Sequence, residues 1–198
     1  MAGPCASHSS TLVADAPAST ESGEARETPS QKRRRWALFG GVAAVVVLLD
    51  QLTKTWVDAN FERAANGGST EFIGDLVRIS KVYNDGAIFG FLDTTATLMA
   101  VLTVFVVAGV TWYEWRHGAG LGPLVTVGLG LLTGGAIGNL IDRLRFGHVI
   151  DFVDMGVGDT RWYAWNISDA AVFIGIVALF GAALLGDRAP GVRPRVAA

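Results

Sequence analysis

Five charged residues follow a long apolar run, within the stretch "GNLIDRLRFGHVIDFVD" at positions 138–154. They are Asp142, Arg143, Arg145, Asp151 and Asp154. Such residues are either the water-facing end of a membrane helix or the groups of a chemical site. Chemistry is plausible because an apolar setting raises the pKa of a carboxyl and two carboxyls brought together titrate apart. One ionised aspartate then takes a proton from water while a protonated partner donates to the leaving group, which is acid–base hydrolysis.

Asp151 and Asp169 are the candidates for this pair. Asp151 lies between apolar neighbours in "HVIDFVD", and Asp169 in "WNISDA" begins the last apolar segment, with Asn166 one turn before it. An alternative for Asp169 is a helix N-cap, where Asp is among the preferred residues. Spacing alone leaves both roles open. Asp154 and Asp159, in a stretch with glycines and a threonine, are expected to be solvated loop residues.

Two further groups of polar residues have helical spacing. Asp50 and Lys54 in "DQLTK" are four residues apart, which suits a salt bridge on one helix face. They either anchor a helix end at the interface or orient a polar site below the surface, since intramembrane charges usually face a bundle interior. Asn139, Asp142 and Arg143 are three and four residues apart, so one helix end presents an amide, a carboxylate and a guanidinium together. A purely structural network is the alternative there.

Composition excludes several other classes of protein. The chain is 51% hydrophobic and only 17% charged, which indicates a membrane protein. Its net charge of −2 gives no footprint for nucleic acid, so no nucleic-acid partner is expected. The only cysteine, Cys5, permits no intrachain disulfide. The three histidines form no HExxH motif, so we expect no metal and no cofactor.

The apolar segments are long enough for four membrane spans. The first begins at Trp36, directly after the basic cluster 32–35, and the others are Leu92 to Tyr113, Leu121 to about Ile141, and Asp169 to about Gly186. Four spans put both termini on one side, and the basic cluster assigns that side to the cytoplasm. We therefore predict an all-α membrane protein with four transmembrane helices. Its glycine-rich stretches, "GGVAAVVV" and "GLGLLTGGAIG" among them, predict close helix packing.

The spans divide the chain into a membrane domain and two tails. Residues 1–31 are polar and predict a disordered tail, 32–187 form the membrane domain, and 188–198 are a cytoplasmic tail. Extracytoplasmic connectors are expected at 58–91 and 142–168. The first alternates apolar and polar residues and contains an Asn-Asp-Gly turn, so it predicts a small β-sheet at the membrane surface.

Taken together, these motifs resemble the lipoprotein signal peptidase, or signal peptidase II, family of bacterial inner membranes. The matching segments are "DQLTK", "NDGAIFGF", "GGAIGNLIDRLRFGHVIDFVD" and "WNISDA", in this order and joined by apolar spans from about Trp36 to Gly186. The resemblance implies an aspartyl endopeptidase that cleaves diacylglyceryl-modified prolipoproteins before the lipidated cysteine. It also implies that the sheet forms an extracytoplasmic cradle for the substrate, and that the active site lies near that face of the cytoplasmic membrane.

The resemblance also implies roles for individual residues. Asp151 and Asp169 fall at the positions of the catalytic pair. Positions that line or support the site are Asp50, Lys54, Asn84, Gly86, Asn139, Asp142, Arg143 and Asn166. The family usually carries "NxGAAF" and "NxAD", whereas Ile88 and Ser168 replace alanines here. Ile88 is expected to narrow the cradle, and Ser168 to add a hydrogen bond beside Asp169.

Two rival functions remain at this point. A small proton-coupled transporter would also use intramembrane Asp and Arg, although these acids cluster near one membrane face and do not line the midplane where carriers bind. A scaffold without chemistry would tolerate loss of both aspartates. We favour a peptidase that uses a hydrolytic water, acts as a monomer on prolipoproteins, and has the lipid bilayer as its other partner.

Overall fold

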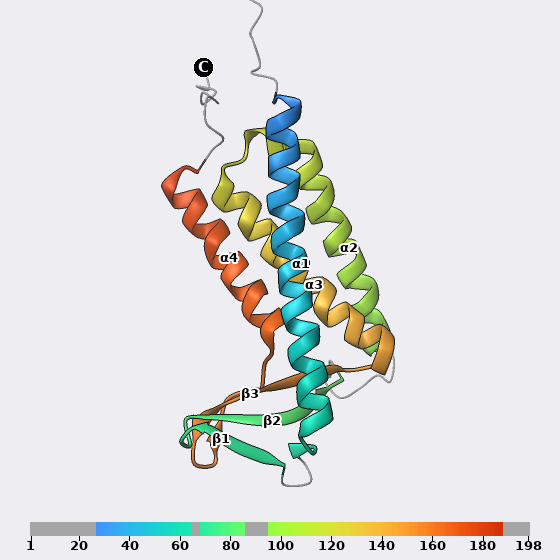
Figure 1. Ribbon diagram of the computed structural model, residues 1–198, viewed down its shortest axis with the longest axis vertical. Helices are drawn as coiled ribbons and strands as arrows, with labels where there is room; N and C mark the ends of the chain where they lie inside the picture. The colour runs from blue at the N-terminus through green and yellow to red at the C-terminus, as the bar shows by residue number, and fades with distance from the viewer. Residues whose placement is uncertain (1–26, 65–67, 86–94, 188–198) are drawn as a thin grey trace, which may run out of the picture.

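Four long helices form an upright bundle, and a small sheet closes one end of it (Figure 1). The computed structural model describes residues 27–64, 68–85 and 95–187. The helices are α1 (Pro29–Asn60), α2 (Thr95–His117), α3 (Pro123–Phe146) and α4 (Ile167–Leu185). Each is long and apolar enough to cross a membrane. The prediction of four transmembrane helices with a small sheet is confirmed.

The helix ends differ from those expected from hydropathy. α1 begins at Pro29, where Thr28 is the N-cap and exchanges capping-box hydrogen bonds with Gln31. Its first turn therefore includes three residues that we had assigned to the polar tail. α3 runs five residues beyond Ile141 and ends at Gly147, which has a φ of 77°. Asp142, Arg143 and Arg145 thus belong to the end of α3, whereas the expected connector began at Asp142.

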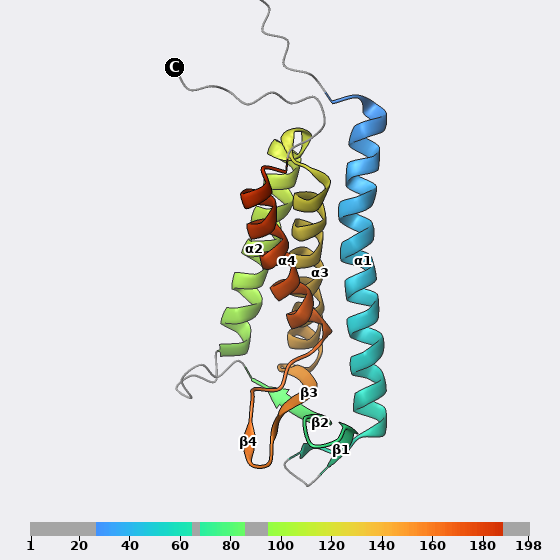
Figure 2. The ribbon, with the colours of Figure 1, turned by 90° about the vertical axis from the view of Figure 1, so that its left-hand side faces the viewer.

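α3 is the central helix and contacts the other three (Figures 1 and 2). Glycines on α3 allow this close approach. A Cβ at Gly134 would lie 2.8 Å from the Ala43 carbonyl oxygen of α1, and one at Gly135 would lie 2.4 Å from the Ser168 carbonyl oxygen of α4. The predicted packing role of "GLGLLTGGAIG" is confirmed. The stretch "GGVAAVVV" also packs closely on α3, but through Ala43 and Val46 next to Gly134, whereas nothing lies within 4 Å of a Cβ at its glycines, Gly40 and Gly41.

The sheet has four antiparallel strands in the order β1-β2-β3-β4. β1 (Ser69–Ile73) and β2 (Val77–Asn84) come from the first connector, as predicted. They join through a turn at Gly74, which has a φ of 51°. The Asn-Asp-Gly sequence is not this turn: Asn84 ends β2, and Gly86 and Ile88 lie outside the described residues.

The second connector contributes the other two strands, β3 (Val149–Val157) and β4 (Thr160–Arg161), which were not predicted. β2 and β3 pair with Val82 opposite Asp151 and Asn84 opposite Val149. This pairing brings the ends of two distant connectors together directly below the helices. A small apolar core of Val57, Ile150 and Phe152 fixes β3 against the end of α1.

The two ends of the bundle are therefore different. The first turn of α1 and the last turn of α4 lie at one end, and the sheet lies at the other (Figure 1). Figure 2 shows the β3–β4 hairpin hanging below the first turn of α4. Residues near the sheet end of every helix are consequently brought near strands from both connectors.

Candidate active site

Nine of the ten site residues predicted from the sequence lie at the sheet end of the bundle; the tenth, Gly86, is outside the described residues. They come from five elements, so only the folded chain unites them. The end of α1 carries two, the end of β2 one, the end of α3 three, β3 one, and the start of α4 two. In that order they are Asp50, Lys54, Asn84, Asn139, Asp142, Arg143, Asp151, Asn166 and Asp169.

Lys54 is the centre of a buried charge network. Its ammonium group lies 2.9 Å from an Asp50 carboxylate oxygen and 2.8 Å from one of Asp142, and it donates to Asn139 Oδ1 at 2.9 Å. All three charged side chains are at most 2% exposed. The ammonium has three N–H groups, and each meets an oxygen. The Asp50–Lys54 pair is therefore part of a network inside the bundle. The alternative considered from the sequence, an anchor of the helix end at the membrane interface, is wrong.

The two aspartates of this network also bind backbone groups of other elements. Asp50 Oδ1 accepts the backbone N–H of Ser168, in the first turn of α4, at 2.9 Å. Asp142 Oδ2 accepts the backbone N–H of Ile150, in β3, at 3.2 Å. The N-terminus of a helix favours negative charge, so Asp50 also stabilises α4 electrostatically. The network thus fixes α4 and β3 relative to α1 and α3.

Gln51 belongs to the same network but was not identified from the sequence. Its Nε2 donates to Asp142 Oδ1 at 2.9 Å and to the Gly138 carbonyl at 3.2 Å. Only its place inside "DQLTK", directly after Asp50, could have pointed to it. A glutamine at one position has no spacing partner, so a periodicity argument misses it.

The start of α4 places Asp169. Asn166, which is fully buried, is the N-cap, and its side chain accepts the backbone N–H of Asp169 at 3.0 Å. Asp169 Oδ2 accepts the backbone N–H of Asn166 at 3.2 Å in return. The N-cap alternative for Asp169 is therefore wrong: Asp169 occupies the third position of a capping box. Its other oxygen, Oδ1, accepts from Asn139 Nδ2 at 2.8 Å.

Asp151 is held by two amides. Its Oδ1 accepts from Asn166 Nδ2 at 2.6 Å, and its Oδ2 accepts from Asn84 Nδ2 at 2.9 Å. Burial raises the pKa of the Asp151 carboxyl to about 6; the Asn84 hydrogen bond opposes this rise, and the negative charge of Asp169 adds to it. Asp151 can therefore gain or lose its proton near neutral pH.

Asn139 and Asn166 connect the two carboxyls. Asn166 Nδ2 bonds both Asp151 and, at 3.2 Å, Asn139 Oδ1, while Asn139 Nδ2 bonds Asp169. Among the described residues neither Asp151 nor Asp169 forms an ion pair. One hydrogen-bond chain of neutral amides therefore joins the two carboxyls.

Arg143 supplies positive charge nearby without pairing directly. Its Nη1 donates to the Asn139 carbonyl oxygen at 3.3 Å, and its buried Nε has no hydrogen-bond partner. The guanidinium charge interacts with Asp142, Asp151 and Asp169. The predicted cluster of Asn139, Asp142 and Arg143 at one helix end is present, with one donor unused.

Two neighbouring residues differ from expectation. Asp154 is not a solvated loop residue: it lies in β3, and its Oδ1 is 3.0 Å from Arg161 Nε. Ser168 Oγ is buried and makes no hydrogen bond. A Cβ at Gly138 would lie 2.1 Å from this oxygen and 2.7 Å from Asp50 Oδ2, so the hydroxyl faces α3 and Asp50. The predicted hydrogen bond beside Asp169 is absent.

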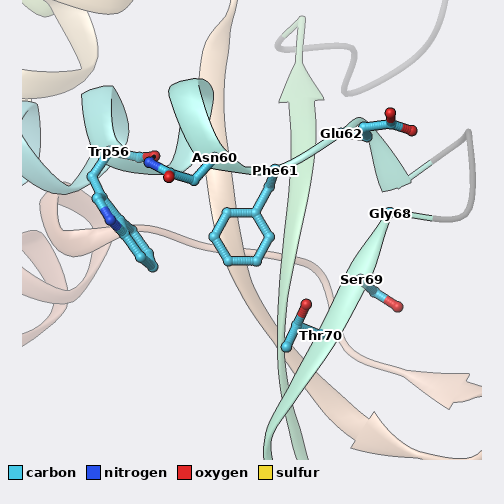
Figure 3. A pocket seen from close by; sticks show the side chains of 7 residues that line it. All are labelled: Trp56, Asn60, Phe61, Glu62, Gly68, Ser69 and Thr70. Carbon is cyan, nitrogen blue, oxygen red and sulfur yellow. Dashed lines mark hydrogen bonds between the residues drawn. The ribbon is translucent and has the colours of Figure 1, made fainter.

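A separate cavity of about 430 Å³ lies between the end of α1 and β1 and contains none of the predicted site residues. Figure 3 shows the rings of Trp56 and Phe61 on one side of it, with Thr70 opposite, while Glu62 points away. The two rings pack edge to face, with their centroids 5.3 Å apart. Within the described residues no group of three His, Cys, Asp or Glu side chains could hold a metal ion, here or elsewhere.

Comparison with known proteins gives consistent matches. Residues 42–185 match the family model described as signal peptidase (SPase) II. The chain is 38% identical over 143 residues to a lipoprotein signal peptidase of Burkholderia mallei, covering 70% of this chain and 82% of the relative. It is also 38% identical over 139 residues to a lipoprotein signal peptidase of Halothermothrix orenii, covering 70% and 89%.

Solved structures agree. A bacterial membrane enzyme determined by the in meso method at 1.9 Å resolution superposes with a TM-score of 0.64 at 28% identity. The match covers 72% of this chain and 90% of that one. A second bacterial membrane enzyme, at 2.3 Å, gives a TM-score of 0.61, also at 28% identity, over 79% and 92%.

Proposed function

Because the chain belongs to the signal peptidase (SPase) II family, we propose that Asp151 and Asp169 are its catalytic pair. Members of this family remove signal peptides from prolipoproteins, and the chain is a membrane protease of the aspartic type. The observation that carries the assignment is that only these two site aspartates are held by neutral amides and not by a cation.

Hydrolysis needs one proton shared between the two carboxyls. The ionised carboxyl accepts a proton from the attacking water while the protonated one donates its proton to the carbonyl oxygen, which gives a tetrahedral diol. The carboxyl that took the water's proton then gives it to the leaving nitrogen as the C–N bond breaks, and the other carboxyl takes back a proton from a diol hydroxyl. Asp151, with its pKa raised to about 6, keeps its proton into the range where an ordinary carboxyl has lost it. Asn139 and Asn166 hold the carboxyls in place, and the unused Nε of Arg143 is a donor for a substrate carbonyl oxygen.

The substrate we propose is a diacylglyceryl-modified prolipoprotein, cut before its lipidated cysteine. The sheet, which carries Asn84 and Asp151, acts as the cradle that holds the peptide beside the pair. We place the protein in the bacterial cytoplasmic membrane with both termini in the cytoplasm, because Lys32 to Arg35 and Arg116 lie at the end of the bundle away from the sheet. The pair then lies near the extracytoplasmic face.

Three further parts of the prediction are proposals of the same kind. Residues 32–187 form the peptidase domain between a polar N-terminal tail and a C-terminal tail from 188. The enzyme acts as a monomer, since one chain supplies both carboxyls. The transporter alternative is not supported by the family. The site acids also lie toward the sheet end of the helices, with Asp142 near the end of α3 and Asp169 in the first turn of α4, and not at the midplane where carriers bind.

The test uses purified protein in detergent and a diacylglyceryl-modified prolipoprotein, with cleavage followed by product size. Asp151→Asn and Asp169→Asn are each expected to reduce the cleavage rate by at least ~10²–10⁴-fold, the usual contribution of an acid–base group. Asp154→Asn, the same change on the same strand, serves as the control and should cleave at nearly the wild-type rate. A chelator should have no effect on wild-type cleavage.

Each contrary outcome has a distinct meaning. Retained activity in either asparagine variant would remove that residue from the pair. Loss of activity with the chelator would replace the aspartic mechanism with a metal-dependent one. No cleavage by folded wild-type protein would contradict the proposed substrate.

A further inference from the structure

A stack of three rings joins the end of β2 to the end of α3. The ring centroids of Tyr83 and His148 are 4.1 Å apart at an interplanar angle of 26°, and those of His148 and Phe146 are 6.0 Å apart at 27°. A guanidinium lies at each end of the stack, that of Arg63 4.2 Å from the Tyr83 centroid and that of Arg145 4.8 Å from the Phe146 centroid. Stacked rings and cations over ring faces attract each other, so the stack holds these segments together.

The register of β2 against β3 changes just before this stack. Ile79 is opposite Val153, whereas Val82 is opposite Asp151, so β2 has one residue more than β3 between these two pairs. The pairing before this bulge therefore does not determine the register after it. Three residue pairs follow the bulge before β2 ends at Asn84. A register that depends on so few pairs at a strand end needs support from cross-strand side-chain contacts.

The end of β2 makes one such contact on each face of the sheet, because successive residues of a strand face opposite sides. On one face, the ring of Tyr83 reaches diagonally to His148, which directly precedes β3. On the other face, the side-chain amide of Asn84 reaches diagonally to Asp151 and donates to its Oδ2 at 2.9 Å. A slip of one residue would exchange the two faces. Both contacts therefore need the same register.

We propose that the stacking of Tyr83 on His148 fixes the register at the end of β2 and thereby positions the Asn84 amide on Asp151. Tyr83 and His148 are positioning residues, since they act on the carboxyl through Asn84. The inference rests on the proposed function where it treats Asp151 as one of the catalytic pair. The register argument itself depends only on the pairing and the ring contacts.

The titration of Asp151 reports on this contact. Burial raises the Asp151 pKa to about 6, and the Asn84 hydrogen bond opposes the rise. Charged groups of three helices also act on this carboxyl, namely Lys54 of α1, Arg143 of α3 and Asp169 of α4. A substitution in the stack changes none of them. Loss of the stack should therefore raise the Asp151 pKa through Asn84.

His148→Ala is the test variant, and His148→Phe is its matched control, because phenylalanine keeps a ring and cannot carry charge. The Asp151 carboxyl is followed between about pH 4 and about pH 9 by carbon-13 NMR of aspartate-labelled protein, and Asp151→Asn identifies its signal. His148→Ala should move the titration midpoint above about 6, by at most about one pH unit, the effect of one hydrogen bond. His148→Phe should titrate like wild type. Tyr83→Leu removes the other ring and should reproduce the His148→Ala result.

A double-mutant cycle separates positioning from general structural damage. In Asn84→Ala protein the contact that the stack supports is already absent. Adding His148→Ala should then leave the Asp151 midpoint where Asn84→Ala alone puts it. Trp56→Ala, which breaks the ring pair of Trp56 and Phe61 at the same end of the bundle, is a further control and should leave the wild-type midpoint unchanged.

Cleavage of the prolipoprotein gives a second readout. The alkaline limb of kcat/KM should move to higher pH in His148→Ala, in the same direction as in Asn84→Ala, and should return with His148→Phe. The loss at the pH optimum should lie mainly in kcat, because a displaced amide disturbs the reacting carboxyl and not the binding of the peptide.

Several results would overturn the inference. An unchanged midpoint in folded His148→Ala protein would show that the stack does not support the Asn84 contact, and Tyr83→Leu decides the question if His148→Ala does not fold. A midpoint that His148→Phe fails to restore would mean that the imidazole acts by its charge and not by its ring. An equal shift with and without Asn84 would mean that the stack acts on Asp151 by another route. If wild type cleaves no prolipoprotein while the titrations follow expectation, the proposed function is rejected and the positioning of Asn84 stands.

Discussion

Two pairs of buried aspartates lie at the same end of the bundle, in different electrostatic surroundings. Asp50 and Asp142 share the ammonium group of Lys54, at 2.9 and 2.8 Å. Asp151 and Asp169 accept hydrogen bonds from neutral amides and, among the described residues, have no ion pair. The charges of Asp50 and Asp142 are neutralised by a cation in direct contact. The carboxyls of Asp151 and Asp169 accept hydrogen bonds only from neutral amide groups.

The difference explains how one site contains both structure and chemistry. A buried ion pair whose donors all have partners holds its elements in position. Its net contribution to stability is small, because taking the charges out of water costs about as much free energy as their attraction returns. Asp151, which is held by amides, has a pKa raised to about 6 by burial. We therefore propose that the Lys54 network is the support and that the amide-held pair is the reactive part.

Removal of the cation should produce the largest loss of stability. Lys54→Met leaves two carboxylates that are at most 1% exposed without a counter-charge, and breaking a buried ion pair typically costs about 3–5 kcal/mol. The thermal midpoint in detergent should fall strongly at pH 7.

Lys81→Met is the control for this change. Lys81 is also nearly buried, but its partner Asp58 has a side chain that is 42% exposed and stays solvated when the lysine is lost. We expect a cost of about 1 kcal/mol or less. An equal loss in the two variants would show that the Lys54 network is no more than an ordinary ion pair.

Asp151→Asn should have the opposite effect on stability. The folded-state pKa of Asp151 is raised, so wild-type protein is most stable where this carboxyl is protonated and loses stability as the pH rises from about 4 to 6. The rise of the Asp151 pKa from 3.8 to about 6 corresponds to a destabilisation of wild-type protein by about 3 kcal/mol at high pH. Asparagine removes this cost but loses one amide hydrogen bond, which reduces the gain by about 1 kcal/mol.

The Asp151→Asn variant should therefore unfold at a higher temperature than wild type at pH 8, and this advantage should disappear near pH 4. Thermal unfolding of both proteins across this pH range measures it. A midpoint difference that is constant with pH would mean that Asp151 does not titrate between 4 and 6 in the folded protein.

Asn84→Ala should shift the pH dependence of cleavage. The Asn84 hydrogen bond lowers the pKa of Asp151, so its loss raises that pKa further. Wild-type kcat/KM should fall above about pH 6 as the pair loses its shared proton, and the variant's alkaline limb should lie up to about one pH unit higher. The apparent values describe the coupled pair. A limb that moves to lower pH would contradict this role of Asn84.

Much of the fold could be predicted from the sequence, because hydropathy over about twenty residues identifies a membrane helix. The ends were less predictable. Asp142 and Arg143 were expected to begin a connector, but α3 continues through Phe146 because Lys54 neutralises Asp142 inside the bundle. β3 was missed because its pairing with β2, which spans over sixty residues of chain, is not visible in local alternation.

The site residues were found by motif, but their contacts were not. Helical spacing left the Asp50–Lys54 pair open between an interfacial anchor and an interior group, because spacing carries no information on what covers a helix face. Contacts such as Asp50 with the Ser168 N–H, or Asn166 with Asp151, join residues from different elements. The catalytic roles themselves remain predictions until the variants are measured.

The smallest expected effect concerns Ser168, which stands in place of the alanine in the "NxAD" pattern that the sequence resembles. Its hydroxyl is fully buried near Asp50 and makes no hydrogen bond, so it adds desolvation cost without a compensating partner. Its backbone N–H, which bonds Asp50, is unaffected by a side-chain change. Ser168→Ala should therefore leave cleavage within about twofold of wild type and stabilise the protein by about 0–1 kcal/mol. A marked loss of activity would show that the hydroxyl belongs to the reactive pair's surroundings and not, as its contacts indicate, to those of the Lys54 network.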